Sequence, residues 1–273
     1  LRTAFIGKVG NDMHGKFLIE AVENQNINSD GIILDDNVFT TLAFVNLTKD
    51  GERSFAFARK PGADTMIGYK EVDTQILQNT KVFHVGSLSL TDEPARSTTF
   101  QAVKCAKNAG AVISYDPNYR APLWNDEKTA IERMRSMLPF ADMIKLSDEE
   151  TALLTPYENP DEAANYLLDH GIKIVAVTLG KEGVLICNRK DHQKVSGFSS
   201  QVVDTTGAGD SFWGGFMSQF VKSKLNPEDC SIEELKKFAR YGNAVASLCI
   251  EKKGGILSIP EEKETFKRLQ LSV

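Results

Sequence analysis

The chain has 273 residues, of which 41% are hydrophobic and 25% are charged, and this composition excludes wholesale disorder. The length predicts one large domain with at most a small appendage. A net charge of −5 gives no general attraction to nucleic acid or to anionic membranes. No apolar run reaches the roughly 20 residues that cross a bilayer, and no secretory signal is visible.

Short β-branched runs alternate with amphipathic stretches along the chain, which predicts an α/β protein. The expected strands are Thr3–Ile6, Val82–Val85, Val112–Tyr115, Met143–Lys145, Ile174–Thr178 and Val184–Cys187. The expected helices are Gly15–Asn24, Pro94–Asn108, Lys128–Leu138, Ser147–Leu154, Asp161–His170, Ala208–Lys222, Ser231–Glu251 and Glu261–Gln270. This alternation implies right-handed crossovers onto a mainly parallel sheet with helices on both faces.

Residues 31–59 interrupt the alternation. Three strand-like runs, Gly31–Leu34, Thr40–Leu47 and Arg53–Ala58, are separated by turn sequences at residues 35–37 and 49–51. The Asp-Gly pair in the second turn favours a hairpin. We therefore expect a small antiparallel sheet inserted as a lid, whose exposed edge would favour homodimerisation.

The four cysteines have no CxxC spacing and no histidine-rich neighbourhood. A metal site or a disulfide framework is therefore disfavoured. Free thiols in a reducing compartment are the better interpretation, so we expect a cytoplasmic protein.

The segment most informative about chemistry is residues 202–216. A strand is expected to end at Val203, and Asp204-Thr205-Thr206-Gly207-Ala208-Gly209-Asp210 leads into a helix. Glycines bring bare amides close to a ligand, and the N-terminus of a helix favours an anion. Asp210 alone is most simply a helix-start residue. Gly214 and Gly215 cost the helix interior roughly 1 kcal/mol each, which indicates a close approach of backbone or ligand.

An anion hole beside a carboxylate is what phosphoryl transfer to a hydroxyl requires. The seven residues from Asp204 to Asp210, with the glycines that follow, resemble the C-terminal signature of the ribokinase-like (PfkB) carbohydrate kinases. The resemblance implies an ATP-dependent sugar kinase in which Asp210 is the catalytic base. The amides of Gly207, Ala208, Gly209 and Asp210 would form the anion hole.

The same resemblance implies a fold and a domain plan. The fold would be a ribokinase-like three-layer α/β/α sandwich with a mainly parallel sheet and a small β-sheet lid. Residues 1–273 would form a single kinase domain, with the lid at residues 31–59. Family members carry a further strand and a sugar-binding aspartate before the equivalent of Leu1, so the N-terminal strand and first signature are expected to be missing here.

Other segments extend the resemblance along most of the chain. Residues 7–15 resemble the early glycine-rich turn of the family, and residues 178–183 resemble its nucleotide-phosphate loop. This implies ATP contacts at Thr178, Gly180 and Gly183. Asn243, in a later helix, would also contact the nucleotide.

Two ion sites are implied as well. Glu150, in Ser147-Asp148-Glu149-Glu150, matches the glutamate of an Asn-x-x-Glu motif that organises Mg²⁺ and phosphate through water. Here serine replaces the asparagine, and Ser147 is also suited to cap a helix. The residues that match a monovalent-cation site, with K⁺ as the candidate ion, are Asp204, Thr206, Gly254 and Ser258.

The substrate is suggested by Asp116-Pro117-Asn118-Tyr119-Arg120, which follows an expected strand at the edge where α/β proteins bind ligands. A Pro-Asn turn accounts for part of this segment, whereas the fork of Arg120 suits phosphate or sugar oxygens. This segment resembles fructokinases and ketodeoxygluconate kinases more than ribokinases or adenosine kinases, and residues 59–64 resemble fructokinases. The resemblance implies Arg59, Asn118, Arg120 and Asp210 as substrate residues, with the 6-hydroxyl of D-fructose as acceptor.

Three alternatives stay open at this stage. The first is a kinase for another sugar or sugar acid, such as 2-keto-3-deoxygluconate or ribose. The second is a non-catalytic sugar- or nucleotide-binding relative, against which the intact Asp210 and its glycines argue. A dinucleotide-binding dehydrogenase is disfavoured, because Gly7-x-x-Gly10 lacks the GxGxxG spacing. The expected partners are a small sugar and ATP, without nucleic acid or membrane.

Overall fold

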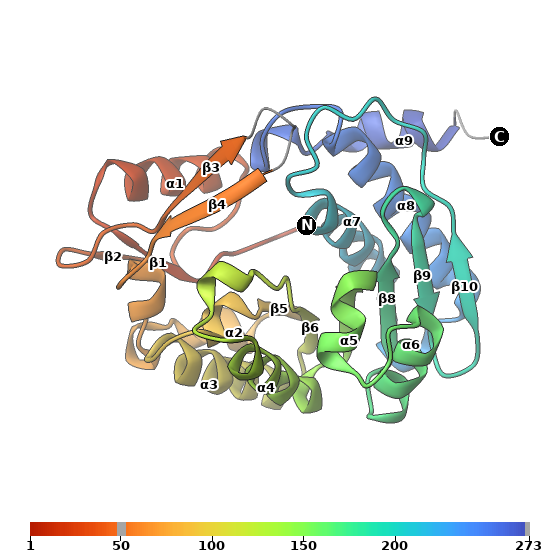
Figure 1. Ribbon diagram of the computed structural model, residues 1–273, viewed down its shortest axis with the longest axis horizontal. Coiled ribbons are helices and arrows are strands. Elements are labelled where there is room, and N and C mark those ends of the chain that lie inside the picture. The colour runs from red at the N-terminus through yellow and green to blue at the C-terminus, as the bar shows by residue number, and fades with distance from the viewer. Residues whose placement is uncertain (48–52, 271–273) are drawn as a thin grey trace. The chain divides into compact units, whose positions relative to one another are not determined.

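The computed structural model describes residues 1–47 and 53–270, which divide into two compact units (Figure 1). The first unit contains Leu1–Ile113 and Pro117–Phe140, and the second contains Ser114–Asp116 and Ala141–Val273. Strand β6 (Val112–Asp116) begins in the first unit and ends in the second. Among the described residues, no helix combines the length and the apolar character that a membrane span requires.

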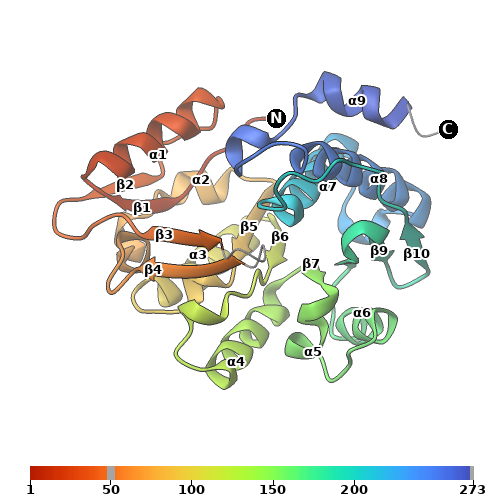
Figure 2. The same cartoon turned by 45° about the horizontal axis from the view of Figure 1, so that its top comes forward.

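The first unit combines short strands with helices. Its strands are β1 (Gly7–Gly10), β2 (Ile32–Asp35), β3 (Leu42–Leu47), β4 (Arg53–Ala58), β5 (Val82–Gly86) and the start of β6. Its helices are α1 (Met13–Asn24), α2 (Thr74–Gln78), α3 (Ala95–Asn108) and α4 (Glu127–Met137). Strands β3 and β4 form the antiparallel ribbon seen in Figure 2, and β5 neighbours β6.

Two expectations for this unit were wrong in detail. The first strand covers Gly7–Gly10 instead of Thr3–Ile6, where only an isolated bridge joins Ala4 to Asn28. Strand β2 pairs in parallel with β1 and takes no part in the antiparallel ribbon. The physical reason is the connection through α1, because a helical crossover returns the chain in the same direction. The expected turn at residues 49–51 lies outside the described residues.

The second unit is built on a sheet with the order β10-β9-β8-β7-β6. Its strands are the end of β6, β7 (Met143–Ser147), β8 (Ile174–Thr178), β9 (Val184–Cys187) and β10 (His192–Val195). Its helices are α5 (Thr151–Leu154), α6 (Pro160–Asp169), α7 (Ala208–Ser223), α8 (Ile232–Cys249) and α9 (Glu262–Gln270). Strands β6 to β8 run parallel, whereas β9 and β10 continue as antiparallel neighbours. Helices α6 and α8 cover opposite faces of β8 and β9 (Figure 1).

Local capping explains why most helices begin within two residues of their expected starts. The side chain of Asp12 caps α1, Asp126 caps α4, and Asn159 caps α6 just before Pro160. Ser231 and Glu234 form a capping box at α8. Each cap satisfies amides that have no partner in the preceding turn, so it stabilises the helix start by about 1 kcal/mol. The expected helix Ser147–Leu154 is a 3-10 turn followed by the short α5.

The core of the second unit is packed around α7. Trp213 stacks on Phe216 at a centroid distance of 4.8 Å and donates a hydrogen bond to Ser114 at 2.8 Å. A Cβ on Gly215 would lie 3.0 Å from the Cα of Gly242, so the two helix backbones approach closely there. Gly214 differs, because its Cβ would meet no atom within 4 Å. The expected close approach of backbone is therefore found at Gly215, whereas no protein atom of the described residues approaches Gly214.

Candidate active site

The signature segment forms a tight turn at the N-terminus of α7, in the second unit. Gly207 has φ +78°, a left-handed conformation that a side chain would strain. The amide of Ala208 donates to the Thr205 carbonyl at 3.2 Å. Gly209 and Asp210 follow in the first helical turn, where amides have no partner in the preceding turn. The turn therefore has the geometry of an anion site, and the exposed side chain of Asp210 stands at its edge.

A buried ion pair lies against this turn, and sequence reasoning did not find it. Lys145 on β7 donates to Asp116 at the end of β6 at 2.8 Å, and the two side chains are only 7% and 4% exposed. A Cβ on Gly209 would lie 2.9 Å from Lys145 Nζ. Burial raises the pKa of Asp116 to about 6, with Lys145 opposing and the charges of Glu150 and Asp210 adding to the effect. The only signal in the sequence was a lysine in an otherwise apolar strand.

Glu150 lies in the 3-10 turn Asp148–Glu150, which follows β7 in the same unit. Its side chain is nearly buried, and Oε2 accepts hydrogen bonds from the amide and the hydroxyl of Ser147 at 2.9 and 3.2 Å. Ser147 therefore occupies the N-cap position of this 3-10 turn, and its hydroxyl donates to Glu150 instead of accepting from an amide. In the described part of the chain, no three His, Cys, Asp or Glu side chains gather as a metal cage. Mg²⁺ commonly binds one or two carboxylates together with substrate phosphates, so a single nearby carboxylate fits a water-mediated role.

The residues expected around the nucleotide lie in one cluster. Thr178 ends β8, and Gly183, at φ +103°, precedes β9. The Gly197 amide donates to the Glu182 carbonyl at 3.3 Å, which joins the loop after β10 to the turn that contains Gly180. Asn243 on α8 reaches this cluster, and its amide nitrogen donates to the carbonyls of residues 195 and 196 at 3.0 Å each. Asn243 thus orients this loop.

The four residues expected around a monovalent cation also lie together. The Asp204 carboxylate accepts hydrogen bonds from the amides of Thr206 at 2.9 Å and Gly254 at 3.1 Å. Cys249 links the other members, because its sulfur lies 3.0 Å from the Ser258 hydroxyl and 3.9 Å from the Thr206 carbonyl.

The residues expected at the substrate belong to the first unit, apart from Asp210. Arg59 is 6% exposed and pairs with Asp64 at 2.6 Å, while it also donates to the Thr91 hydroxyl and the Leu88 carbonyl at 2.8 Å. Arg120 is exposed and donates to the Tyr119 carbonyl at 2.9 Å. Asn118 has φ +45° in the turn before it. Arg59 therefore braces its loop, and Arg120 has the accessibility that an anionic ligand needs.

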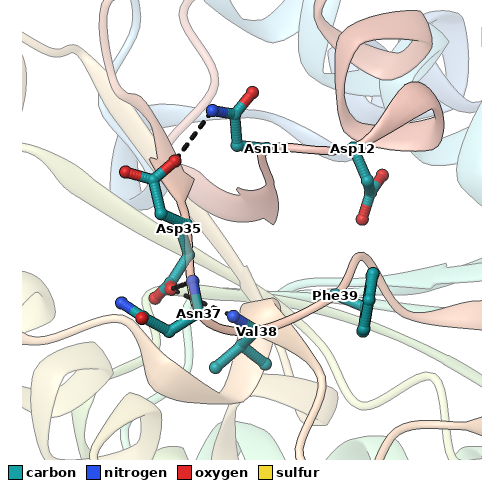
Figure 3. A pocket seen from close by; sticks show the side chains of 7 residues that line it. Asn11, Asp12, Asp35, Asn37, Val38 and Phe39 are labelled. Carbon is teal, nitrogen blue, oxygen red and sulfur yellow. Dashed lines mark hydrogen bonds between the residues drawn. The ribbon is translucent and has the colours of Figure 1, made fainter.

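A small cavity of about 60 Å³ adjoins the early glycine-rich turn of the first unit (Figure 3). It is lined by Asn11, Asp12, Asp35, Asp36, Asn37, Val38 and Phe39. Hydrogen bonds from the amides of Thr40, Gly15 and His14 hold the pKa of Asp12 at about 2. Asp12 therefore serves here as the cap of α1, and Asp35 is paired with Lys8 at 2.9 Å.

The pfkB family carbohydrate kinase model matches residues 1–262. A probable fructokinase-2 of Arabidopsis thaliana is 40% identical over 275 residues, which cover 100% of this chain and 82% of the relative. Fructokinase of Xylella fastidiosa with bound ATP aligns with a TM-score of 0.91 at 30% identity over 98% of this chain and 85% of the other. Fructokinase of Vibrio cholerae with fructose, ADP and a calcium ion aligns with 0.89 at 30% identity over the same shares. The expected fold and resemblance are confirmed, and the chain belongs to the pfkB family of carbohydrate kinases.

Proposed function

We propose that the chain is an ATP-dependent fructokinase that phosphorylates the 6-hydroxyl of D-fructose. The observation that carries the proposal is the exposed carboxylate of Asp210 in the first turn of α7, beside the left-handed Gly207. Asp210 accepts the proton of the 6-hydroxyl as its oxygen attacks the γ-phosphorus of ATP. The bond from that phosphorus to the bridging oxygen breaks, and ADP leaves with the electron pair.

The anion hole stabilises charge on the transferred group. The amides of Gly209 and Asp210 lie at the positive end of α7, in its first turn, and we propose them as donors of the anion hole. Mg²⁺, when bound with ATP, neutralises phosphate charge, and Glu150 is the residue that we propose to hold it through water. Asp204, Thr206, Gly254 and Ser258 are proposed to hold a monovalent cation such as K⁺ behind the turn.

Different residues are proposed to bind the two substrates. We propose that the cluster of Thr178, Gly180, Gly183 and Asn243 binds ATP. Asn118 and Arg120 of the first unit are proposed to bind sugar or phosphate oxygens, since a guanidinium suits both. Arg59, whose fork already binds Asp64, Thr91 and Leu88, is proposed to shape the substrate loop. The match to fructokinases with bound ATP, fructose and ADP supports these assignments.

Two further assignments accompany this function. The four cysteines are free, which supports a reducing compartment such as the cytoplasm. We also propose a homodimer formed through the β3–β4 ribbon, on which the large apolar side chain of Phe44 is 58% exposed. Light scattering during size-exclusion chromatography measures the oligomeric state, and a monomer at micromolar concentration would contradict the proposed homodimer.

The test of the function is an ADP-release assay with MgATP and a panel of fructose, ribose, adenosine and 2-keto-3-deoxygluconate. Fructose should be turned over fastest, and Asp210→Asn should lower kcat about 10³-fold while the protein keeps its thermal stability. Activity on another sugar alone would replace the substrate but keep the role of Asp210. An Asp210→Asn variant close to the wild-type rate would remove the catalytic base.

A further inference from the structure

Lys145 is a charged side chain in the middle of a buried strand. Its neighbours on β7, Ile144 and Leu146, have no exposed surface, and the lysine side chain itself is only 7% exposed. Taking an ammonium group out of water is costly even when it is paired. A methionine of similar length would fill the same space without this cost, so the charge calls for an explanation beyond packing.

The ammonium of Lys145 lies between two defined neighbours. On one side it donates to Asp116 at 2.8 Å. On the other side lies Gly209, where a Cβ would be 2.9 Å from Lys145 Nζ and 3.4 Å from its Cε. The lysine can reach this position because residue 209 has no side chain. The positive charge is therefore held directly against the backbone of the first turn of α7.

Two further carboxylates act on Asp116. The charges of Glu150 and Asp210 both act on Asp116, so three carboxylates share this region. A helix N-terminus contributes only about half a positive charge. Three carboxylates without a compensating cation would repel an incoming phosphate. Lys145 supplies that cation from within the fold.

Resting on the proposed kinase function, we propose that Lys145 is a positioning residue for phosphoryl transfer. Its ammonium, held by Asp116 against Gly209, keeps the anion hole positive while the phosphoryl group passes to the sugar. Lys145 acts on the phosphoryl group through the backbone of the turn and does not contact the phosphoryl group itself. Asp116 fixes the lysine in place.

The test compares Lys145→Met with the double variant Lys145→Met/Asp116→Asn. The single variant leaves the Asp116 carboxylate buried without its cation, so its Tm should fall. The double variant buries no charge, so its Tm should return to within a few degrees of the wild type. Lys237→Met, which removes an exposed charge from α8, is the matched control and should behave as the wild type.

The kcat of the double variant distinguishes an electrostatic role of Lys145 in catalysis from a purely structural one. The double variant should regain stability and still show a kcat for fructose phosphorylation about 10- to 100-fold below the wild type, somewhat less than the loss of a direct anion-hole donor. Recovery of both Tm and kcat would overturn the proposal, because the pair would then be structural only.

A binding measurement keeps this test separate from the identity of the sugar. Calorimetry without sugar compares the affinities for ADP and for a non-hydrolysable ATP analogue. The double variant should lose at least about 3-fold more affinity for the analogue, since the γ-phosphate lies nearest the anion hole. Equal losses for the two nucleotides would contradict the role of Lys145. A wild-type protein inactive on fructose would refute the proposed function, and the affinity ratio would then decide the inference by itself.

Discussion

Replacing Gly209 by alanine tests how closely Lys145 approaches the turn. The added Cβ would lie 2.9 Å from Lys145 Nζ, well inside ordinary van der Waals contact, and the lysine would have to withdraw. It is held by the 2.8 Å contact with Asp116, and both side chains are buried. Withdrawal therefore stretches a buried ion pair instead of rotating a free side chain.

The size of the effect follows from three contributions. Crowding in a packed site costs about 1–3 kcal/mol, and complete loss of a buried pair costs about 3–5 kcal/mol. Alanine in a helix returns up to about 1 kcal/mol relative to glycine. A partial stretch of the pair gives a net loss of about 1–2 kcal/mol, which lowers Tm by roughly 2–5 °C for a chain of this size.

Gly214→Ala is the matched control in the same helix. Its Cβ would meet no atom within 4 Å, so only the helix propensity changes, and stability should rise by up to about 1 kcal/mol. Thermal unfolding followed by circular dichroism measures both variants, and the ADP-release assay measures kcat, which should fall only for Gly209→Ala. Equal stability of the two alanine variants would refute the close contact between Lys145 and the turn.

Three further variants test other parts of the two units. Asp12→Ala should lower the free energy of unfolding by about 1–2 kcal/mol at pH 7. Because the folded-state pKa of Asp12, about 2, lies below the unfolded value, this loss should shrink between about pH 4 and pH 2 in urea unfolding. A loss that does not depend on pH would contradict this role of the Asp12 carboxylate. Arg59→Lys should lower Tm and raise KM for fructose, because lysine cannot bind Asp64, a hydroxyl and a carbonyl with one fork; an unchanged Tm would contradict the bracing role. Asn243→Ala should cost about 1–3 kcal/mol by leaving two carbonyls without their donor and should weaken ADP binding in calorimetry; wild-type affinity would remove Asn243 from the nucleotide cluster.

Short-range patterns determined most of the helices, the parallel strands β6 to β8 and the chemically important turn. Asp126, Asn159 and Ser231 fix helix starts through bonds to amides two or three residues away, so the sequence contains nearly all the information needed. The signature at residues 204–210 is equally local. Its expected place at the start of a helix is confirmed by α7.

Pairing between distant segments was decided only by the tertiary structure. Whether Ile32–Asp35 joins a lid or pairs in parallel with Gly7–Gly10 depends on backbone hydrogen bonds to a segment 25 residues away, which no local propensity encodes. The same holds for Arg59, a fork that suits a ligand but binds Asp64 within its own loop. Lys145 is the clearest case. The sequence shows a lysine in an apolar strand. Its contacts with Asp116 and Gly209 exist only because β6, β7 and the first turn of α7 meet in the folded unit. Burial there strengthens the electrostatic interactions of the ammonium group.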